Sequence, residues 1–272
     1  MSFDVITMGS STVDVFARTS ATDEQVIDIR SGERQVELMA YPLGSKILIE
    51  RLDSYAGGGG TNTAVAFARL GLTAGYVGKL GKDVNGLDVV RTLRKEGVEF
   101  LGAVGQRTGF SFVLNSQAHD RTVFTFRGCN DDLRFEELRL DRLEARWLYS
   151  SSLIGESFTT LARVARLMKA KGTKVALNPS AYLAKKGVQY LQPALPLLDL
   201  LVLNKEEAQL LVGSGDEGFL LRKLKALVPG MVIVTDGARG SWALASGQVL
   251  YLAPRPVEVV ESTGAGDAFA AT

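Results

Sequence analysis

The stretch STGAGDAF near the end of the chain carries residues that suit phosphoryl transfer. Gly264, Ala265 and Gly266 permit a tight turn whose backbone N–H groups point outward at the start of a helix, where they can bind an anion. Asp267 follows in the first helical turn, which favours a charged carboxylate. Such a base could accept a proton from an attacking hydroxyl while the amides stabilise the transferred phosphoryl group. An ordinary helix N-terminus can have the same sequence, so this motif alone does not distinguish a phosphoryl-transfer site from a helix start without a catalytic role.

A second glycine cluster, YAGGGGTNTAVAFARLG, covers residues 55–71. Glycines leave the backbone open to a ligand, and the segment leads directly into a helical pattern. Asn62 can both donate to and accept from a sugar hydroxyl. The alternative is a plain hinge before a helix capped by Thr61, Asn62 or Thr63.

The segment NKEEAQLL places Asn204 at the end of an apolar run and Glu207 in the next helical turn. A spacing of three residues puts both side chains on one side of the helix, where they could hold a hydrated Mg²⁺ through water. An N-terminal capping box formed by the same two residues is equally natural. Other phosphate-binding signatures are excluded: the sequence has no P-loop motif, and GAGDAF lacks the third glycine and the downstream unit of a dinucleotide fingerprint.

Short apolar runs alternate with segments of helical period, which predicts an α/β fold whose central, mostly parallel sheet has helices on both faces. Strands are expected at residues 3–9, 74–81, 145–152, 173–179, 198–204 and 230–237. Helices are expected at residues 61–71, 86–97, 157–172 and 216–227. Ser157 is the expected N-cap of the third helix and Gly172 the residue just past its end.

Two segments interrupt this alternation. Residues 15–55 contain several β-rich runs without helical period, and residues 110–127 predict a hairpin that turns near 117–120. We expect these insertions to form a small sheet that covers a cleft as a lid. An edge extension or a dimerisation sheet is the alternative, and an exposed sheet edge favours a homodimer.

Composition favours a small-molecule ligand over a macromolecular one. The chain has 272 residues and a formal net charge of +1, so no long-range field attracts nucleic acid or an acidic membrane. Cys129 is the single cysteine, which excludes a disulfide within the chain. The N-terminal residues lack a basic leader, and no apolar stretch reaches the ~20 residues that span a bilayer. These features predict a cytoplasmic protein.

Seven motifs in order resemble the PfkB or ribokinase-type carbohydrate kinases along essentially the whole chain. They are GSSTVD, GGGGTNTAVAFARLG, GKLGKDVNG, ALNPS, LVLNKEEAQLLVG, VTDGARGSWAL and STGAGDAF. The resemblance implies one ribokinase-like α/β domain over residues 1–272, with a small β-sheet lid. It also implies transfer of the γ-phosphoryl group of ATP to a hydroxyl of a sugar or sugar-like substrate, with Mg²⁺ and room for a monovalent cation.

The resemblance also assigns site residues. Asp267 is implied as the catalytic base, with Gly264, Ala265 and Gly266 as the anion hole. Substrate-binding positions are Asp14, Gly58, Gly59, Asn62 and Arg127. Nucleotide-binding positions are Asn178, Asn204, Thr235, Gly237 and Gly240, with Glu207 holding the metal through water. Arg127 and Asn130 follow the hairpin and are expected to reach the cleft, although Arg127 is equally suited to a surface ion pair.

Several alternatives stay open. The acceptor is a sugar, a sugar acid, a nucleoside or a sugar phosphate, and a phosphate would need cations such as Lys79, Lys82, Arg107 or Arg127. Gly59 and Gly60 replace the Lys-Gly pair of a typical ribokinase. A non-catalytic binding protein with the same fold is the alternative function. Members of the family continue past GAGDAF, so we expect the chain to be C-terminally truncated and poorly active in this form. His119 is expected in an exposed turn and Cys129 as a small packed residue.

Overall fold

The structure is a computed structural model that describes residues 2–19, 25–31, 34–115, 121–257 and 264–272. Within these residues the main sheet has nine strands, and seven of them, β15, β14, β13, β12, β1, β6 and β8, pair in parallel. In spatial order they are β17 (Gln248–Leu252), β16 (Ser241–Ala245), β15 (Met231–Thr235), β14 (Leu200–Asn204), β13 (Lys174–Leu177), β12 (Ala145–Ser150), β1 (Phe3–Met8), β6 (Ala74–Val77) and β8 (Glu99–Phe100). The antiparallel strands β16 and β17 complete one edge.

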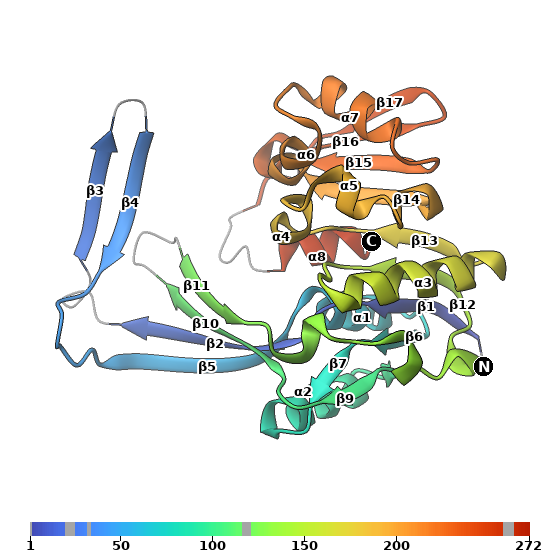
Figure 1. The fold of residues 1–272 in the computed structure, drawn as a ribbon. Coiled ribbons are helices and arrows are strands. Elements are labelled where there is room, and N and C mark those ends of the chain that lie inside the picture. The colour runs from blue at the N-terminus through green and yellow to red at the C-terminus, as the bar shows by residue number, and fades with distance from the viewer. Residues whose placement is uncertain (1, 20–24, 32–33, 116–120, 258–263) are drawn as a thin grey trace.

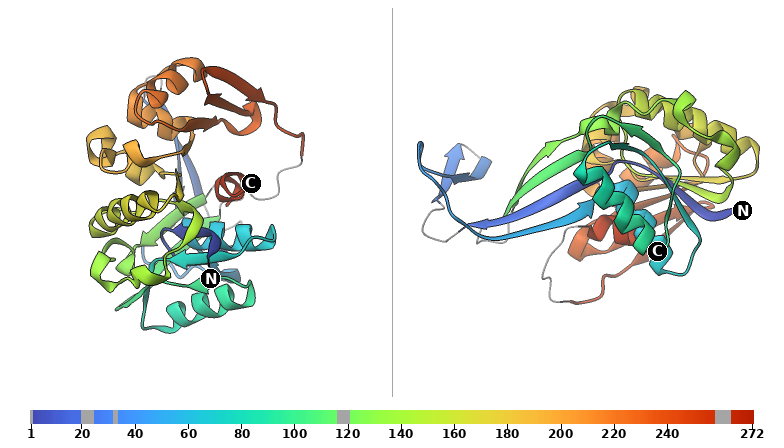
Figure 2. Two further views of the ribbon diagram at one scale, coloured as in Figure 1. Left: turned by 90° about the vertical axis from the view of Figure 1, so that its right-hand side faces the viewer. Right: turned by 90° about the horizontal axis from the view of Figure 1, so that it is seen from below.

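Helices cover both faces of this sheet, with α3 on one face and α1 and α8 on the other (Figures 1 and 2). The α-helices are α1 (Gly59–Arg69), α2 (Val84–Lys95), α3 (Glu156–Ala170), α4 (Ala181–Ala184), α5 (Gly187–Leu191), α6 (Lys205–Val212), α7 (Glu217–Lys225) and α8 (Ala265–Ala270). Short 3₁₀ turns occupy Gly128–Asp131, Phe135–Glu137, Leu140–Arg142, Leu195–Leu197 and Gly237–Arg239. This arrangement confirms the predicted fold class.

The alternating directions of the side chains along β1 explain why an apolar core forms on both faces of the sheet. Ile6 and Met8 belong to the apolar cluster beneath α3, whereas Val5 belongs to the cluster beneath α1 and α2. Successive side chains of a strand point to opposite faces, so a continuous apolar run supplies both layers. In the described residues no helix is long and apolar enough to cross a membrane.

A second sheet extends away from the main sheet (Figure 1). It contains β11 (Arg121–Phe126), β10 (Gly109–Asn115), β2 (Thr12–Thr19) and β5 (Ile49–Gly57) in that order, and we call it the lid sheet. The hairpin of β3 (Gln25–Ser31) and β4 (Arg34–Ala40) forms a separate two-stranded sheet. The turn expected at residues 117–120, with His119, lies outside the described residues.

Two local predictions were wrong. Residues 74–81 do not form one strand. β1 ends at Met8, opposite Val77, and after a break at Gly78 the chain enters β7 (Lys79–Gly81), which pairs with β9 (Ala103–Gly105). Ser157 is not the N-cap of α3, because Gly155 holds that position with a φ of 62° and the buried Ser157 hydroxyl accepts from the Leu133 N–H at 2.8 Å. Gly172, with a φ of 91°, follows the C-cap Lys171 as predicted.

Candidate active site

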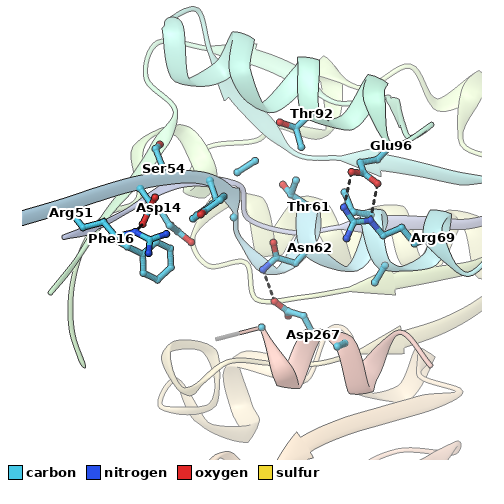
Figure 3. Close-up of a pocket in the computed structure, with 18 of the residues that line it drawn as sticks. Asp14, Phe16, Arg51, Ser54, Thr61, Asn62, Arg69, Thr92, Glu96 and Asp267 are labelled. Atoms are coloured by element: carbon cyan, nitrogen blue, oxygen red, sulfur yellow. Dashed lines mark hydrogen bonds and ion pairs between the residues drawn. The ribbon is translucent and has the colours of Figure 1, made fainter. Parts of the chain in front are cut away.

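Asp267 and Asn62 meet although they are 205 residues apart in sequence. Asp267 lies on α8 and Asn62 on α1, and these helices pack against each other. The Asn62 Nδ2 donates to Asp267 Oδ2 at 2.8 Å, as Figure 3 shows. Burial raises the pKa of Asp267, the hydrogen bond from Asn62 opposes this rise, and the charge of Asp14 adds to it. The result is an oriented carboxylate that is more basic than an exposed one.

A pocket of about 980 Å³ lies between α1, α8 and the lid sheet. Four of the residues singled out in the sequence line it, namely Asp14, Asn62, Gly264 and Asp267. Figure 3 shows Asp14 on the lid side of this pocket and Asp267 on the α8 side. The two carboxylates therefore face one space from two elements.

The GGGG segment allows its backbone to pass close to other parts of the site. Gly58 has a φ of 92°, and a Cβ added there would lie 2.5 Å from the Ser10 carbonyl oxygen. A Cβ on Gly59 would lie 2.8 Å from the Cβ of Ser151 and 3.3 Å from Asp267 Oδ1. Larger residues at either position would displace the loop or crowd Asp267.

Three buried polar atoms at the site have no hydrogen-bond partner within the described part of the chain: Asp14 Oδ1, Thr61 Oγ1 and Ser151 Oγ. Buried polar atoms are normally paired, so these three are suited to a polar ligand. Sequence reasoning missed Ser151. Its signal was its place directly after β12, because the carboxyl ends of parallel strands meet at the edge where ligands bind.

The residues implied for the nucleotide lie outside this pocket, at the ends of three adjacent strands. Asn178 follows β13 and donates from Nδ2 to the Val202 carbonyl at 2.8 Å. Asn204 ends β14, and Thr235 ends β15. Gly237 and Gly240 form the turn into β16, where Gly240 has a φ of 96° and accepts from the Asp236 N–H at 2.9 Å. These residues share the carboxyl edge of the sheet without lining the pocket around Asp267.

Asn204 and Glu207 form the capping box that was one of the two open interpretations. Asn204 Oδ1 accepts from the Glu207 N–H at 2.8 Å, and Glu207 Oε2 accepts from the Asn204 N–H at 3.0 Å. Burial raises the pKa of Glu207 to about 7, and the charge of Asp267 contributes to this rise. No cluster of three acidic, histidine or cysteine side chains that could hold a metal occurs in the described residues. A cation here would need oxygen ligands from water or a bound phosphate.

Arg127 and Lys79 are engaged in ion pairs away from the pocket. Arg127 pairs with Asp131 at 2.6 Å, and Lys79 is buried against Glu137 at 2.8 Å. Neither side chain lines the pocket around Asp267, so the structure gives Arg127 the ion pair rather than the cleft contact. Cys129 is buried and donates to the Lys79 carbonyl, which agrees with a packed residue.

Asn130 does not line the pocket, but its side chain binds the backbone next to the pocket. Its Oδ1 accepts from the Ser11 N–H and its Nδ2 donates to the Ser11 carbonyl, both at 2.8 Å. Ser11 lies directly before β2, which carries Asp14, and next to Gly58. Asn130 thus holds the start of the lid sheet in place.

Replacing Asn130 with alanine should destabilise the protein by about 2–4 kcal/mol, because both buried backbone groups of Ser11 lose their partner. Urea unfolding of Asn130→Ala measures this effect. Asn85→Ala on α2, whose side chain makes no hydrogen bond within the described residues, should stay within about 0.5 kcal/mol of the wild type. Equal stabilities of the two variants would contradict the supporting role.

The parallel sheet, the lid sheet and a carboxylate at a glycine-rich helix start define a ribokinase-like fold. Solved structures share it: a ribokinase from Arabidopsis thaliana complexed with ribose and ATP has a TM-score of 0.79 at 23% identity, with 100% of this chain and 84% of that chain covered. An E. coli protein described as ribokinase II, in complex with ATP and Mg²⁺, has a TM-score of 0.78 at 20% identity over 100% and 84% of the two chains.

Comparison with known sequences assigns the chain to a family, which is more specific than the fold. The family model for pfkB family carbohydrate kinases matches residues 27–272. A fructokinase from Klebsiella pneumoniae is 34% identical over 236 residues, which cover 81% of this chain and 76% of the relative. The chain therefore belongs to the PfkB family of carbohydrate kinases, as its motifs predicted.

Proposed function

We propose that this carbohydrate kinase transfers the γ-phosphoryl group of ATP to a hydroxyl of a sugar-like acceptor, with Asp267 removing the proton of that hydroxyl. The observation that carries this proposal is the hydrogen bond from Asn62 to Asp267, which directs a half-buried carboxylate into the pocket that also contains Asp14. A general base must be oriented and must lie within reach of the proton that it takes.

The acceptor binds between the lid sheet and α1. Asp14 Oδ1, which lacks a partner in the described structure, accepts a hydrogen bond from one acceptor hydroxyl. Gly58 and Gly59 let the acceptor approach the backbone beside Asp267. The lid sheet closes the outer side and excludes water, which strengthens the electrostatic contacts inside.

The phosphoryl group meets the first amides of α8. Gly264 adopts a left-handed conformation with a φ of 78°, and the first helical hydrogen bond is donated by Ala268 to the Gly264 carbonyl. The amides of Ala265 and Gly266 precede that bond and have no partner within the helix. They act as the anion hole that stabilises negative charge on the transferred group.

ATP lies along the carboxyl edge of the sheet. Two structural relatives were solved in complex with ATP, which supports ATP as the phosphoryl donor. The nucleotide-binding residues are Asn178, Asn204, Thr235, Gly237 and Gly240. Mg²⁺ bound to the phosphates would supply positive charge that offsets their developing negative charge. Glu207 fits this role through water, because a half-buried carboxylate with a raised pKa gains from a nearby cation. A monovalent cation and a cytoplasmic location stay predictions.

Phosphate transfer from labelled ATP to a panel of ribose, fructose, nucleosides, 2-keto-3-deoxygluconate and hexose phosphates tests the proposal. A labelled product whose formation depends on Asp267 would support it. ATP binding without a labelled product from any acceptor would favour a non-catalytic binding protein.

We further propose that the chain forms a homodimer through the lid sheet. Register places Leu52, Phe124 and Phe126 on the sheet face opposite Asp14, and their exposed fractions are 60%, 60% and 54%. Exposed apolar side chains gathered on one face are typical of an interaction surface.

Phe124→Glu should weaken self-association about 10- to 100-fold, because a buried aromatic contact is replaced by a charge. Light scattering over a concentration series measures the change. Val84→Glu, at an exposed site on α2, is the matched control. A wild-type protein that stays monomeric at every concentration would contradict the dimer.

A further inference from the structure

One face of the lid sheet presents three chemically different zones to the pocket. Along β2 the residues Asp14, Phe16 and Arg18 alternate with residues of the opposite face, so their side chains share one face. Their register partners on β5 are Tyr55, Asp53 and Arg51, in the same order. All six residues line the pocket that contains Asp267.

The inner pair of residues is Asp14 with Tyr55, and the middle pair is Phe16 with Asp53. Asp14 lies nearest the GGGG segment, because Gly57, at the end of β5, has its added Cβ 2.0 Å from Asp14 Oδ2. The rings of Phe16 and Tyr55 lie diagonally across the strand pair, with centroids 6.0 Å apart in an edge-to-face arrangement. Figure 3 shows Phe16 and Arg51 next to Asp14 on the lid side of the pocket.

The outer zone carries net positive charge. Arg51 Nε donates to Asp53 Oδ2 at 2.6 Å, which compensates one arginine. Arg18 directly faces Arg51 across the strand pair and has no ion-pair partner in the described residues. Like charges placed opposite each other destabilise a strand pair, so an anion bound beside Arg18 and Arg51 would reduce their mutual repulsion.

Other candidate cations, Arg69 inside the pocket and Lys79 and Arg127 outside it, are held in ion pairs. Arg69, at the opposite end, makes two hydrogen bonds to Glu96, at 2.8 and 2.7 Å. Lys79 and Arg127, which the sequence offered as phosphate ligands, are held in their own ion pairs. Among the cationic side chains that line the pocket, Arg18 has no ion-pair partner in the described residues, and Arg51, which pairs with Asp53, faces it across the strand pair.

We propose that the acceptor is an anionic sugar, which places its reacting hydroxyl between Asp14 and Asp267 and its carboxylate or phosphate against Arg18 and Arg51. This inference rests on the proposed kinase function and names the substrate class of the same site. Four residues of strand separate Asp14 from Arg18, which is roughly 13 Å between their Cα atoms. The long arginine side chains can shorten that span, and Phe16 with Tyr55 offers an apolar surface to the sugar carbons between the two ends.

The test compares acceptors that differ in charge. Wild-type protein is assayed with fructose and ribose as neutral acceptors, with 2-keto-3-deoxygluconate as a carboxylate and with fructose 6-phosphate as a phosphate. Calorimetric titration with each compound, without ATP, gives a readout that does not depend on turnover. We expect at least one anionic compound to bind more tightly than every neutral one, and the two anionic arms identify which anion the site takes.

Arg18→Gln should lower the ratio of anionic to neutral kcat/KM about 10- to 100-fold, because a hydrogen-bonded charge contact is lost. Arg18→Lys should recover part of this ratio, since it keeps the charge but not the planar fork. Arg91→Gln on α2, whose exposed side chain pairs with Asp88, is the matched control and should leave the ratio unchanged.

The outcomes separate the two proposals. Phosphorylation of neutral sugars, with no preference for the anionic ones and no effect of Arg18→Gln on the ratio, would overturn the anionic acceptor but keep the kinase function. Binding of an anionic sugar without phosphorylation of any acceptor would overturn the kinase function but keep the anionic site.

Discussion

Asp267→Asn should lower kcat by about 10²–10⁴-fold, which is the usual contribution of a positioned general base. The amide keeps the size of the carboxylate and can still pair with Asn62, so the pocket should remain intact. What disappears is the ability to accept the proton of the acceptor hydroxyl. Labelled phosphate transfer gives kcat, and calorimetry with ATP and acceptor shows whether binding is retained.

The pH profile of the wild type adds an independent check. Because burial raises the pKa of Asp267, activity should fall on the acid side at a higher pH than for an exposed aspartate. Asp88→Asn, at an exposed position on α2, serves as the control and should leave both kcat and the profile unchanged. Turnover by Asp267→Asn within tenfold of the wild type, about 1.4 kcal/mol in barrier, would refute the assigned base.

Gly58→Ala should destabilise the protein by about 2–4 kcal/mol, since it combines an unfavourable backbone conformation with a steric collision. The φ of 92° is one that residues with a Cβ rarely adopt, and the new Cβ would lie 2.5 Å from the Ser10 carbonyl oxygen and 2.6 Å from the Ser11 Cα. These contacts are to backbone atoms, which cannot rotate away. Displacement of this loop should also weaken acceptor binding.

Gly71→Ala separates the effect of the unfavourable backbone conformation from the effect of the steric collision. Gly71 has a similar φ of 87°, but no atom lies within 4 Å of the position that its Cβ would take. Gly71→Ala should lower the free energy of unfolding by only about 1 kcal/mol, and the affinity for the acceptor should not change. Urea unfolding compares the variants. Equal losses for both would show that backbone conformation alone matters and that the close approach of the loops does not.

Much of the fold could be predicted because it depends on local patterns. Runs such as residues 3–9 and 198–204 are mostly apolar, as expected of strands that are buried on both faces. The segments that became α2, α3 and α7 carry a helical period. The break at Gly78 was not visible, because it depends on where the neighbouring strand β1 ends.

The sequence alone determined which residue types lie at the starts of helices and the ends of strands: Asp267 after a glycine turn, Asn62 after GGGG, and Asn204 with Glu207. It also determined the order of motifs that identifies the family. These features depend on nearest neighbours along the chain, which local sequence specifies.

Only the tertiary structure decided which of these residues meet. Packing of α1 against α8 brings Asn62 to 2.8 Å from Asp267, whereas the local pair with Asp131 keeps Arg127 out of the pocket. Strand register places Arg18 opposite Arg51 on the face that carries Asp14. Contacts between distant segments depend on register and helix packing, which involve the whole chain at once, and therefore no single motif contains them.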